Sequence, residues 1–315
     1  MTLALLFSPQ GSQAVGMGRE LAEHSPAARA VYEEADATLG WSVSAACWEG
    51  PAERLDDTRQ TQPCLLTTSI AALRALEERV PLQPTVVAGH SVGEYAALVA
   101  AGVLDLPAAL RLVARRAELM AGAGDDGGMA AILGLDRATV ERLVESVGRP
   151  TDLVVANENA PGQIVISGRY DALDEVEGAL RAAGARRIVR LHVSGAFHSP
   201  LMAGVAGELA VAFEAEEWNE PRMSVMSNVT AEPLRDAARL RALLAEQVRS
   251  PVEWVRCVER MESDGIDTVI ELGPGSALVG MVRRIAPELR TASVSDRTGV
   301  DAAVALLGAP TGVSV

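Results

Sequence analysis

The sequence predicts an α/β fold in which a mainly parallel sheet is interrupted by a smaller, ferredoxin-like subdomain. Through most of the chain, short apolar segments alternate with longer amphipathic ones, which is typical of parallel strands covered by helices on both faces. Residues 127–193 have a different order: strand, helix, two strands, helix, strand. With 315 residues, 49% of them hydrophobic, the chain is long enough to bury a sizeable core.

The first part of the chain has strand-like and helix-like patterns that lead up to Ser91. Pro63 is expected to open a helix, because proline is tolerated in a first helical turn. A compact apolar strand comes directly before Ser91, and an Ala-rich helix follows it. The expected elements are, in order, a strand at 3–7, helices within 17–40, a helix at 63–80 and a strand at 85–90.

The insertion and the segment after it complete the predicted architecture. The small ferredoxin-like subdomain is assigned to residues 127–193, and the large subdomain to residues 1–126 and 194–315. Within the insertion we expect strands at 128–135, 153–159, 162–168 and 186–193 and helices at 137–147 and 170–184. Beyond it we expect a helix from Met202, a strand at 223–228, a helix at 239–248, a strand at 268–273 and a helix within 273–285.

Composition excludes several classes of function. A formal net charge of −14 argues against general nucleic-acid binding, because phosphate neutralisation needs a basic face. No apolar run is long enough for a membrane span, and no basic segment precedes the short apolar run at the N-terminus, so a cytoplasmic protein is expected. Cys47, Cys64 and Cys257 have no close-spaced partner, so neither a disulfide framework nor a metal site is expected.

Ser91 is the candidate nucleophile. Residues 89–93, GHSVG, match the G-x-S-x-G elbow, in which a strand turns sharply into a helix and exposes the serine hydroxyl. The turn directs the positive end of the following helix, including the backbone N–H of Val92, toward an oxyanion formed at Ser91. The alternative is that Ser91 is only a small residue that caps a helix between glycines.

A serine nucleophile needs a base, and the chain has four histidines. His90 is adjacent to Ser91 and is expected to leave the strand by the opposite face. His24 lies in a polar, surface-like turn, and His192 is placed inside the last strand of the insertion with a structural role. His198 lies in the loop that returns the chain to the main sheet, so it is paired with Ser91. Capping of the helix near residue 200 is the alternative role for His198.

No acid between Ser91 and His198 stands out as the third member of a triad. We therefore expect a dyad, in which a neutral acceptor or a backbone carbonyl orients the imidazole.

Several stretches together resemble the malonyl-CoA:acyl-carrier-protein transacylases and the related acyltransferase domains of polyketide synthases. They fall in the order and spacing of that family and cover nearly the whole chain. The stretches are QGSQ (10–13), TQP (61–63), GHSVGE (89–94), VARRAELM (113–120), ANENAPGQIVISG (156–168), VSGAFHSPLM (193–202), SNVT (227–230), SPVEW (250–254) and ELGPG (271–275).

The resemblance implies a hydrolase-like large subdomain, with the active site in the cleft beside the ferredoxin-like one. It implies that Ser91 carries the acyl group and that His198 acts first as base and then as acid. The backbone N–H groups of Gln10 and Val92 are implied to form the oxyanion hole, and the main-chain carbonyl of Gln247 to orient the histidine. One departure concerns Pro9, which stands where the family has glycine; proline lacks an N–H and restricts φ next to Gln10.

Arg116 and Phe197 are the candidate substrate-binding residues. A guanidinium can grip a free carboxylate with two parallel hydrogen bonds, and Arg116 stands where the family has its carboxylate-binding arginine. In related acyltransferases, a phenylalanine directly before the histidine accompanies malonyl units, so Phe197 implies a malonyl substrate; a larger carboxyacyl unit such as methylmalonyl is the alternative.

The implied reaction moves a malonyl group from coenzyme A to the phosphopantetheine thiol of an acyl carrier protein, for fatty-acid or polyketide synthesis. The coenzyme A thioester is a substrate, and no permanently bound cofactor is expected. Because carrier proteins are typically acidic, a local basic patch at residues 181–190 with Arg283 and Arg284 is the candidate docking surface. Two alternatives are an acyl hydrolase or thioesterase that uses the same elbow, and a non-catalytic docking module that keeps the fold.

Overall fold

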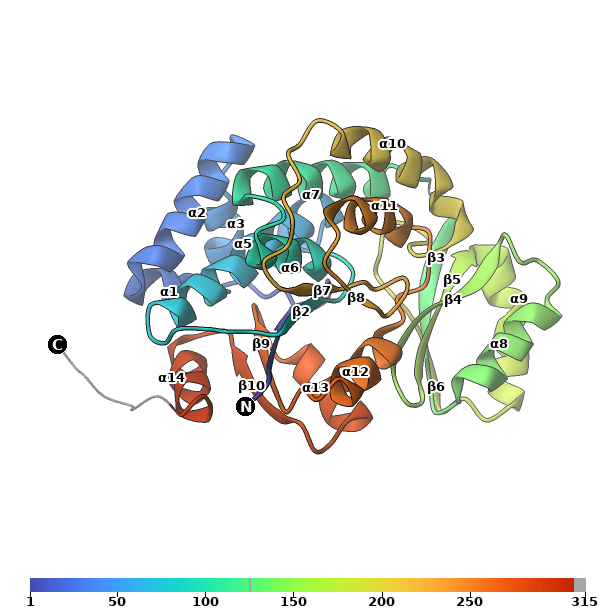
Figure 1. Ribbon diagram of the computed structural model, residues 1–315. Coiled ribbons are helices and arrows are strands. Elements are labelled where there is room, and N and C mark those ends of the chain that lie inside the picture. The colour runs from blue at the N-terminus through green and yellow to red at the C-terminus, as the bar shows by residue number, and fades with distance from the viewer. Residues whose placement is uncertain (125, 309–315) are drawn as a thin grey trace.

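The computed structural model describes residues 1–124 and 126–308, which form two β-sheets surrounded by helices (Figure 1). The larger sheet has the strand order β10-β9-β1-β2-β7-β8. Neighbouring strands in it are parallel, except for the antiparallel pair β7 and β8. Its strands are β1 (Leu3–Phe7), β2 (Val86–Gly89), β7 (Ser224–Met226), β8 (Pro233–Leu234), β9 (Thr268–Leu272) and β10 (Arg290–Val294).

Strand β1 lies between β9 and β2, and all five of its residues are buried. Leu5 and Phe7 belong to the hydrophobic cluster on one face of the sheet, whereas Ala4 and Leu6 belong to the cluster on the other. Successive side chains of a strand point to opposite faces, so both faces of this sheet are covered.

Helices form the two covering layers. Helices α2, α5, α6 and α7 contribute to the cluster that contains Leu5, and α12 and α13 contribute to the opposite cluster (Figure 1). The helices outside the smaller sheet are α1 (Arg19–His24), α2 (Pro26–Leu39), α3 (Val43–Glu49), α4 (Ala52–Leu55), α5 (Thr58–Glu77), α6 (Gly93–Ala101), α7 (Leu106–Ala121), η1 (Pro200–Met202), α10 (Ala203–Phe213), α11 (Ala237–Gln247), α12 (Trp254–Ser263), α13 (Ala277–Ile285) and α14 (Arg297–Leu306).

The smaller sheet is antiparallel, with the order β4-β5-β3-β6. One of its faces packs with two helices in a hydrophobic cluster of its own, whereas Met129 and Val165 on the other face join the core of the large sheet. Its elements are β3 (Gly127–Leu133), α8 (Arg137–Ser146), β4 (Leu153–Ala160), β5 (Gln163–Arg169), α9 (Tyr170–Ala182) and β6 (Arg187–Arg190).

Two contacts join β4 and α8 to the segment before α12. The backbone N–H of Val252 donates to the carbonyl of Ala156 at 2.8 Å. The guanidinium of Arg137 donates to both carboxylate oxygens of Glu253, at 2.6 and 3.0 Å. These contacts position the smaller sheet against the large one.

The predicted α/β fold class, with its β-α-β-β-α-β insertion, is confirmed. The predicted start of a helix at Pro63 is wrong: α5 begins at Thr58, because Asp57 caps it by accepting from the N–H of Arg59, and Pro63 lies inside the helix. The sequence analysis did not predict α3, α4, β8, β10, α12 and α14. Among the described residues, no helix is long and apolar enough to cross a membrane.

Candidate active site

Ser91 lies at the turn between β2 and α6, and its backbone is in the left-handed region with φ 54°. Two glycines make this turn sterically possible. A Cβ on Gly89 would lie 1.9 Å from the carbonyl carbon of Gly93, and a Cβ on Gly93 would lie 2.3 Å from the carbonyl oxygen of Phe7. The close approach of α6 to β1 and β2 therefore requires glycine on both sides of the serine.

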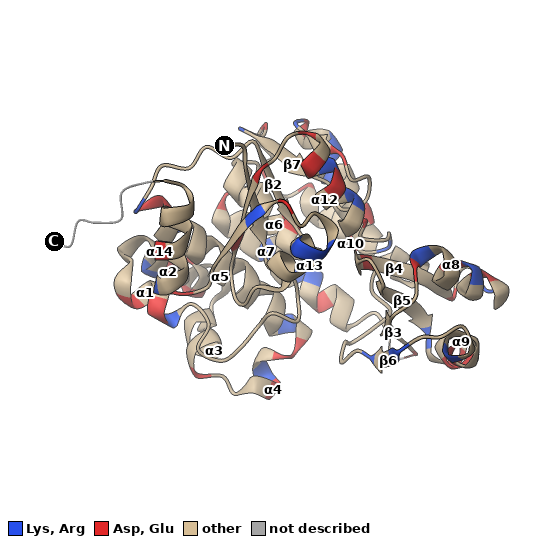
Figure 2. Cartoon of the chain, turned by 90° about the horizontal axis from the view of Figure 1, so that it is seen from below, with Lys and Arg blue, Asp and Glu red and all other residues tan. Residues whose placement is uncertain are grey.

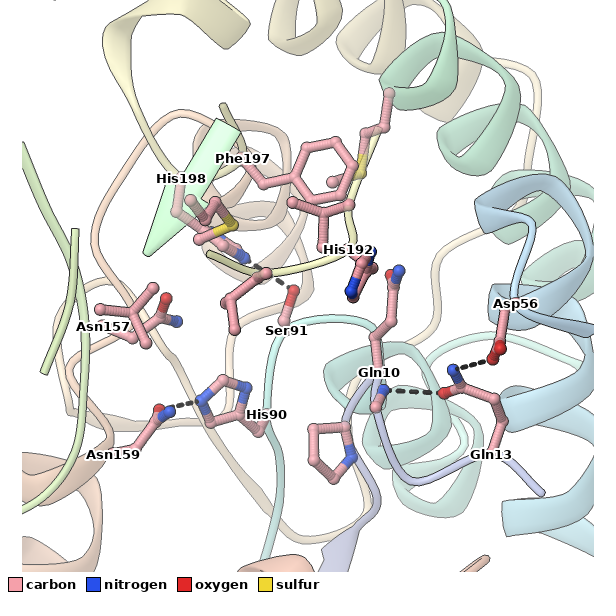
Figure 3. A pocket seen from close by; sticks show the side chains of 17 residues that line it. Gln10, Gln13, Asp56, His90, Ser91, Asn157, Asn159, His192, Phe197 and His198 are labelled. Atoms are coloured by element: carbon pink, nitrogen blue, oxygen red, sulfur yellow. Dashed lines mark hydrogen bonds between the residues drawn. The ribbon is translucent and has the colours of Figure 1, made fainter. Parts of the chain in front are cut away.

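His198 contacts the serine hydroxyl. Ser91 Oγ and His198 Nε2 are 2.8 Å apart, and the backbone of His198 is also left-handed, with φ 58° (Figure 3). Its Nδ1 lies 2.8 Å from the carbonyl oxygen of Gln247 and 3.2 Å from that of Ser250. Because a carbonyl only accepts, Nδ1 carries the hydrogen and Nε2 presents its lone pair to Ser91. The following helix is capped by Ser199, whose Oγ accepts from the N–H of Leu201.

Arg116 reaches the same hydroxyl from α7. Its Nη2 donates to Ser91 Oγ at 2.9 Å and to Gln247 Oε1 at 3.1 Å, and its Nη1 donates to Gln62 Oε1 at 2.7 Å. The side chain is 1% exposed, and among the described residues its Nε has no hydrogen-bond partner. Burial lowers the pKa of this guanidinium below its usual range, but arginine remains protonated in proteins. The exposed neighbour Arg115 instead pairs with Glu118 and Glu208.

The backbone amides of Gln10 and Val92 lie at the ends of β1 and β2, close to the elbow. Within the described part of the chain, neither amide N–H donates a hydrogen bond to another protein group. Free N–H groups beside a nucleophile are the feature that an oxyanion hole needs. Pro9 is followed by a tight turn, in which the N–H of Ser12 donates to the Pro9 carbonyl at 3.3 Å.

A cavity of about 460 Å³ opens in front of Ser91, between the large sheet and strands of the smaller one (Figure 3). Gln10, Phe197 and His198 line it, together with apolar side chains such as Met129 and Val165. The structure thus brings these sequence-predicted residues to one cavity, whereas Arg116 and Gln247 lie behind its wall.

The placement of His192 inside a strand was wrong. Strand β6 ends at Arg190, because only one further backbone hydrogen bond, from the Leu191 N–H to Met129, continues the pairing before the chain turns away. His192 is exposed and lines the cavity. The Arg- and Val-rich sequence of residues 186–193 gave no sign of this turn.

The sequence analysis assigned no role to three further residues of the site. Gln62 and Glu94 lie within the TQP and GHSVGE stretches, and Asn228 lies within SNVT. Asn228 Oδ1 accepts from the backbone N–H of Ser91, and its Nδ2 donates to the carbonyl of Gly89, both at 2.7 Å. The sequence signal that could have identified them is that each is a polar residue inside a stretch that resembles the family.

No group of three or more His, Cys, Asp or Glu side chains within the described ranges is arranged to hold a metal ion. The arrangement at Ser91 instead provides a hydroxyl, a neutral base, a fixed cation and free amide donors, which suits acyl transfer through a serine ester.

Burial, together with the charge of Arg116, lowers the pKa of His198 from 6.5 to about 3. Below pH 6.5 the unfolded chain therefore binds a proton at this residue that the folded chain does not bind. The stabilising contribution is complete above pH 6.5 and is lost as the pH falls toward 3. We expect the free energy of unfolding to fall more steeply in the wild type than in H198Q between pH 6.5 and 4.5, by up to about 1.4 kcal/mol per pH unit.

Urea denaturation at a series of pH values measures this difference, with H24Q, a substitution on the exposed face of α1, as the control. Parallel curves for the wild type and H198Q would contradict the expectation.

The chain matches the model of the acyl transferase domain family over residues 4–300. It is 41% identical to the malonyl CoA-acyl carrier protein transacylase of Bacillus subtilis over 308 residues, which cover 97% of each chain. The Escherichia coli K12 transacylase of the same name is 38% identical, over 96% of this chain and 99% of its own.

Solved structures agree with these sequence matches. A malonyl-transacylase in complex with its type II PKS acyl-carrier protein superposes with a TM-score of 0.93 at 38% identity, covering 98% of this chain and all of the other. An acyl carrier protein S-malonyltransferase from Vibrio cholerae gives the same score and identity over 96% of this chain. The chain therefore belongs to the acyltransferase family, among the malonyl CoA-acyl carrier protein transacylases.

Proposed function

We propose that this protein transfers a malonyl group from coenzyme A to the phosphopantetheine thiol of an acyl carrier protein through an ester on Ser91. One observation carries the proposal: Ser91 Oγ lies 2.8 Å from His198 Nε2 and 2.9 Å from Arg116 Nη2. A base and a fixed cation thus meet at one hydroxyl. The named relatives are transacylases, which favours transfer over the alternative of hydrolysis.

In the first half-reaction, His198 Nε2 accepts the proton of Ser91 as Oγ attacks the thioester carbonyl. The tetrahedral oxyanion accepts hydrogen bonds from the backbone N–H groups of Gln10 and Val92. The C–S bond then breaks, and His198 returns the proton to the departing coenzyme A thiolate. In the second half-reaction the thiol of the carrier arm gives its proton to His198 and attacks the ester carbonyl. The ester C–O bond then breaks, and His198 returns the proton to Ser91 Oγ.

Arg116 selects an acyl group that bears a carboxylate. Gln62 and Gln247 fix its guanidinium through neutral oxygens, and no carboxylate among the described residues contacts the cation. A malonyl carboxylate is separated from the ester carbonyl by one methylene, which keeps it close to Oγ and to the donors of Arg116. The ring of Phe197 fills part of the cavity and, in this proposal, favours malonyl over methylmalonyl.

The division of the chain follows the two sheets. We place the large subdomain at residues 1–126 and 194–315 and the small one at 127–193, with the substrate arm entering the cavity that both of them line. The expected location of the protein is the cytoplasm, where coenzyme A thioesters and carrier proteins are its substrates.

Incubation with malonyl-CoA is expected to add one malonyl group to Ser91, because the activated hydroxyl forms a stable ester in the absence of a carrier thiol. Intact-protein mass spectrometry detects this gain, and S91A is expected to show none. The further addition of a phosphopantetheinylated carrier protein should return the enzyme to its original mass. Release of free malonate instead of malonyl-carrier would favour the hydrolase.

Removal of the guanidinium in R116A is expected to reduce the preference for malonyl-CoA over acetyl-CoA. The loss of one partner of a buried charge pair costs about 2–5 kcal/mol, so the ratio of the two kcat/KM values should fall roughly 30-fold or more. R115A is the matched control, because Arg115 is the adjacent residue of α7 but pairs with surface acids. An unchanged ratio in R116A would argue against the carboxylate-binding role.

Four arginines of the candidate docking surface have no carboxylate partner among the described residues: Arg186, Arg187, Arg283 and Arg284. They belong to the start of β6 and the end of α13, where Figure 2 shows basic segments. Arg284 donates to Gln163 Oε1 at 2.7 Å and so spans from α13 to the smaller sheet. These residues offer unpaired positive charge to an acidic carrier.

Charge reversal in R187E and R284E is expected to raise the KM for the carrier protein several-fold, while acylation of Ser91 by malonyl-CoA keeps its rate. Steady-state kinetics at two salt concentrations measures the effect, which should shrink at high salt. R19E on α1, at the opposite end of the molecule, serves as the control (Figure 1). An unchanged KM for the carrier in both variants would exclude this surface.

A further inference from the structure

Glu94 is a buried acid that the acyl-transfer steps leave unused. It stands in the first turn of α6, three residues after Ser91, and is 1% exposed. Its Oε2 accepts from Gln247 Nε2 at 2.7 Å and from the backbone N–H of Asn228 at 3.2 Å. A buried carboxylate is unfavourable unless hydrogen bonds and a counter-charge compensate for its lost hydration. Both of its partners belong to the site, which suggests a role there.

The first partner, Gln247, connects Glu94 to three reacting or binding groups. Besides Glu94, Gln247 Nε2 contacts the carbonyl oxygen of Ser91 at 3.0 Å. Its Oε1 accepts from Arg116 Nη2, and its main-chain carbonyl accepts from His198 Nδ1. A change in the orientation of the Gln247 amide would therefore disturb the Arg116 cation and the Ser91 elbow together.

Glu94, together with Arg116 and the carbonyl of Ser91, fixes which way the amide of Gln247 points. The two ends of a glutamine amide have nearly the same shape, so only their partners distinguish them. An ionised carboxylate can only accept, so it requires the NH₂ end of Gln247. The oxygen end then faces Arg116, which can only donate. The reversed amide would put an oxygen against the carboxylate and an NH₂ group against the guanidinium.

The second partner, Asn228, connects Glu94 to the elbow. Its side chain accepts from the backbone N–H of Ser91 and donates to the carbonyl of Gly89. Its own backbone N–H is held by Glu94. The strained turn is thus fixed on the N-terminal side of Ser91, at the Ser91 N–H and the Gly89 carbonyl, by a residue that Glu94 anchors.

We propose that Glu94 is a positioning residue for acyl transfer: its buried carboxylate orients the amide of Gln247 and anchors Asn228, and through them it holds Arg116 and the Ser91 elbow in place. The inference rests on the proposed function and deepens it. Glu94 does not touch the substrate; it acts through neighbours that do.

The same carboxylate makes the site sensitive to pH. Burial raises the pKa of Glu94 to about 7, although its hydrogen bonds and the Arg116 charge oppose this. The other titratable or charged groups that face it are the Arg116 guanidinium, the Cys257 thiol of α12 and the Tyr95 phenol of its own helix. Burial raises the pKa of both the thiol and the phenol well above neutral.

The nearby imidazoles do not titrate near neutral pH either, because burial lowers the pKa of His198 to about 3 and that of His90 to about 4. Among these groups, Glu94 alone changes its charge near pH 7. Once protonated, its carboxyl loses the negative charge that strengthens its hydrogen bonds with Gln247 and Asn228.

The test measures the rate of Ser91 acylation at saturating malonyl-CoA between about pH 5.5 and 8.5, by quenched intact-protein mass spectrometry. The wild-type rate is expected to rise with pH, with a midpoint of about 7. In E94Q, which keeps the shape but not the charge, the rate at high pH should be roughly ten-fold lower and the rise should be absent. E94D keeps the charge, so it should keep the rise at a reduced rate.

The matched control is E271Q. Glu271 is another fully buried acid, and it accepts from the backbone N–H groups of Leu278 and Val279 at the start of α13. E271Q is expected to melt at a lower temperature and still keep the rise near pH 7. It therefore separates a general loss of stability from the loss of positioning.

Circular dichroism establishes that each variant is folded. Folded E94Q with the wild-type rate and pH profile would overturn the inference. If E94Q does not fold, the pH dependence of Ser91 acylation in the wild type and in E94D provides the test. A wild-type rate that does not change between about pH 6 and 8 would then overturn the inference. A wild type that takes up no malonyl group would instead overturn the proposed function, and this inference with it.

Discussion

The steric contact between α6 and the strands beneath it is the constraint on which the site depends. Gly93 lies so close to Phe7 and Gly89 that no side chain fits at either glycine. The chain passes from β2 to α6 through His90, Ser91 and Val92, and of these Ser91 adopts the left-handed backbone. The hydroxyl is therefore presented at the carboxyl ends of parallel strands, where side chains from other elements can converge on it.

Electrostatics at this hydroxyl follows from burial. Arg116 is an almost fully buried cation whose hydrogen bonds go to neutral oxygens, and among the described residues no carboxylate contacts it. The same charge, added to the effect of burial, keeps the imidazole of His198 neutral and ready to accept a proton. Gln247 connects Glu94 to Arg116 through hydrogen bonds. The carboxylate of Glu94 therefore balances the buried positive charge of Arg116 without contacting the guanidinium.

Much of the fold could be predicted because its elements have strong local patterns. The continuous apolar run of β1 and the Gly-His-Ser-Val-Gly turn are readable without a structure. Two of the strands that were missed have weak local signals: β8 has two residues, and β10 lies at a sheet edge and is only partly buried. Helix α5 begins earlier than predicted, since the cap at Asp57 adds a turn before Pro63.

The residues of the site likewise divide into those that the sequence predicted and those that it did not. Ser91 was predicted from its turn, His198 by elimination among the histidines, and Arg116 from the family resemblance. Gln62, Glu94 and Asn228 were not assigned roles, because an isolated glutamine, glutamate or asparagine has no pattern of its own in a sequence. His192 was assigned wrongly, because strand-like residues continue past the point where the chain leaves the sheet.

The sequence by itself determined the class of fold, the strained turn at Ser91 and the type of chemistry, because apolar periodicity, glycine spacing and residue type are local properties. Only the tertiary structure decided that three side chains from positions 91, 116 and 198 share hydrogen bonds, and that Gln247 joins them to a buried acid. The physical reason is that hydrogen-bond partners and burial depend on distances between residues that are 25 to 153 positions apart in the chain.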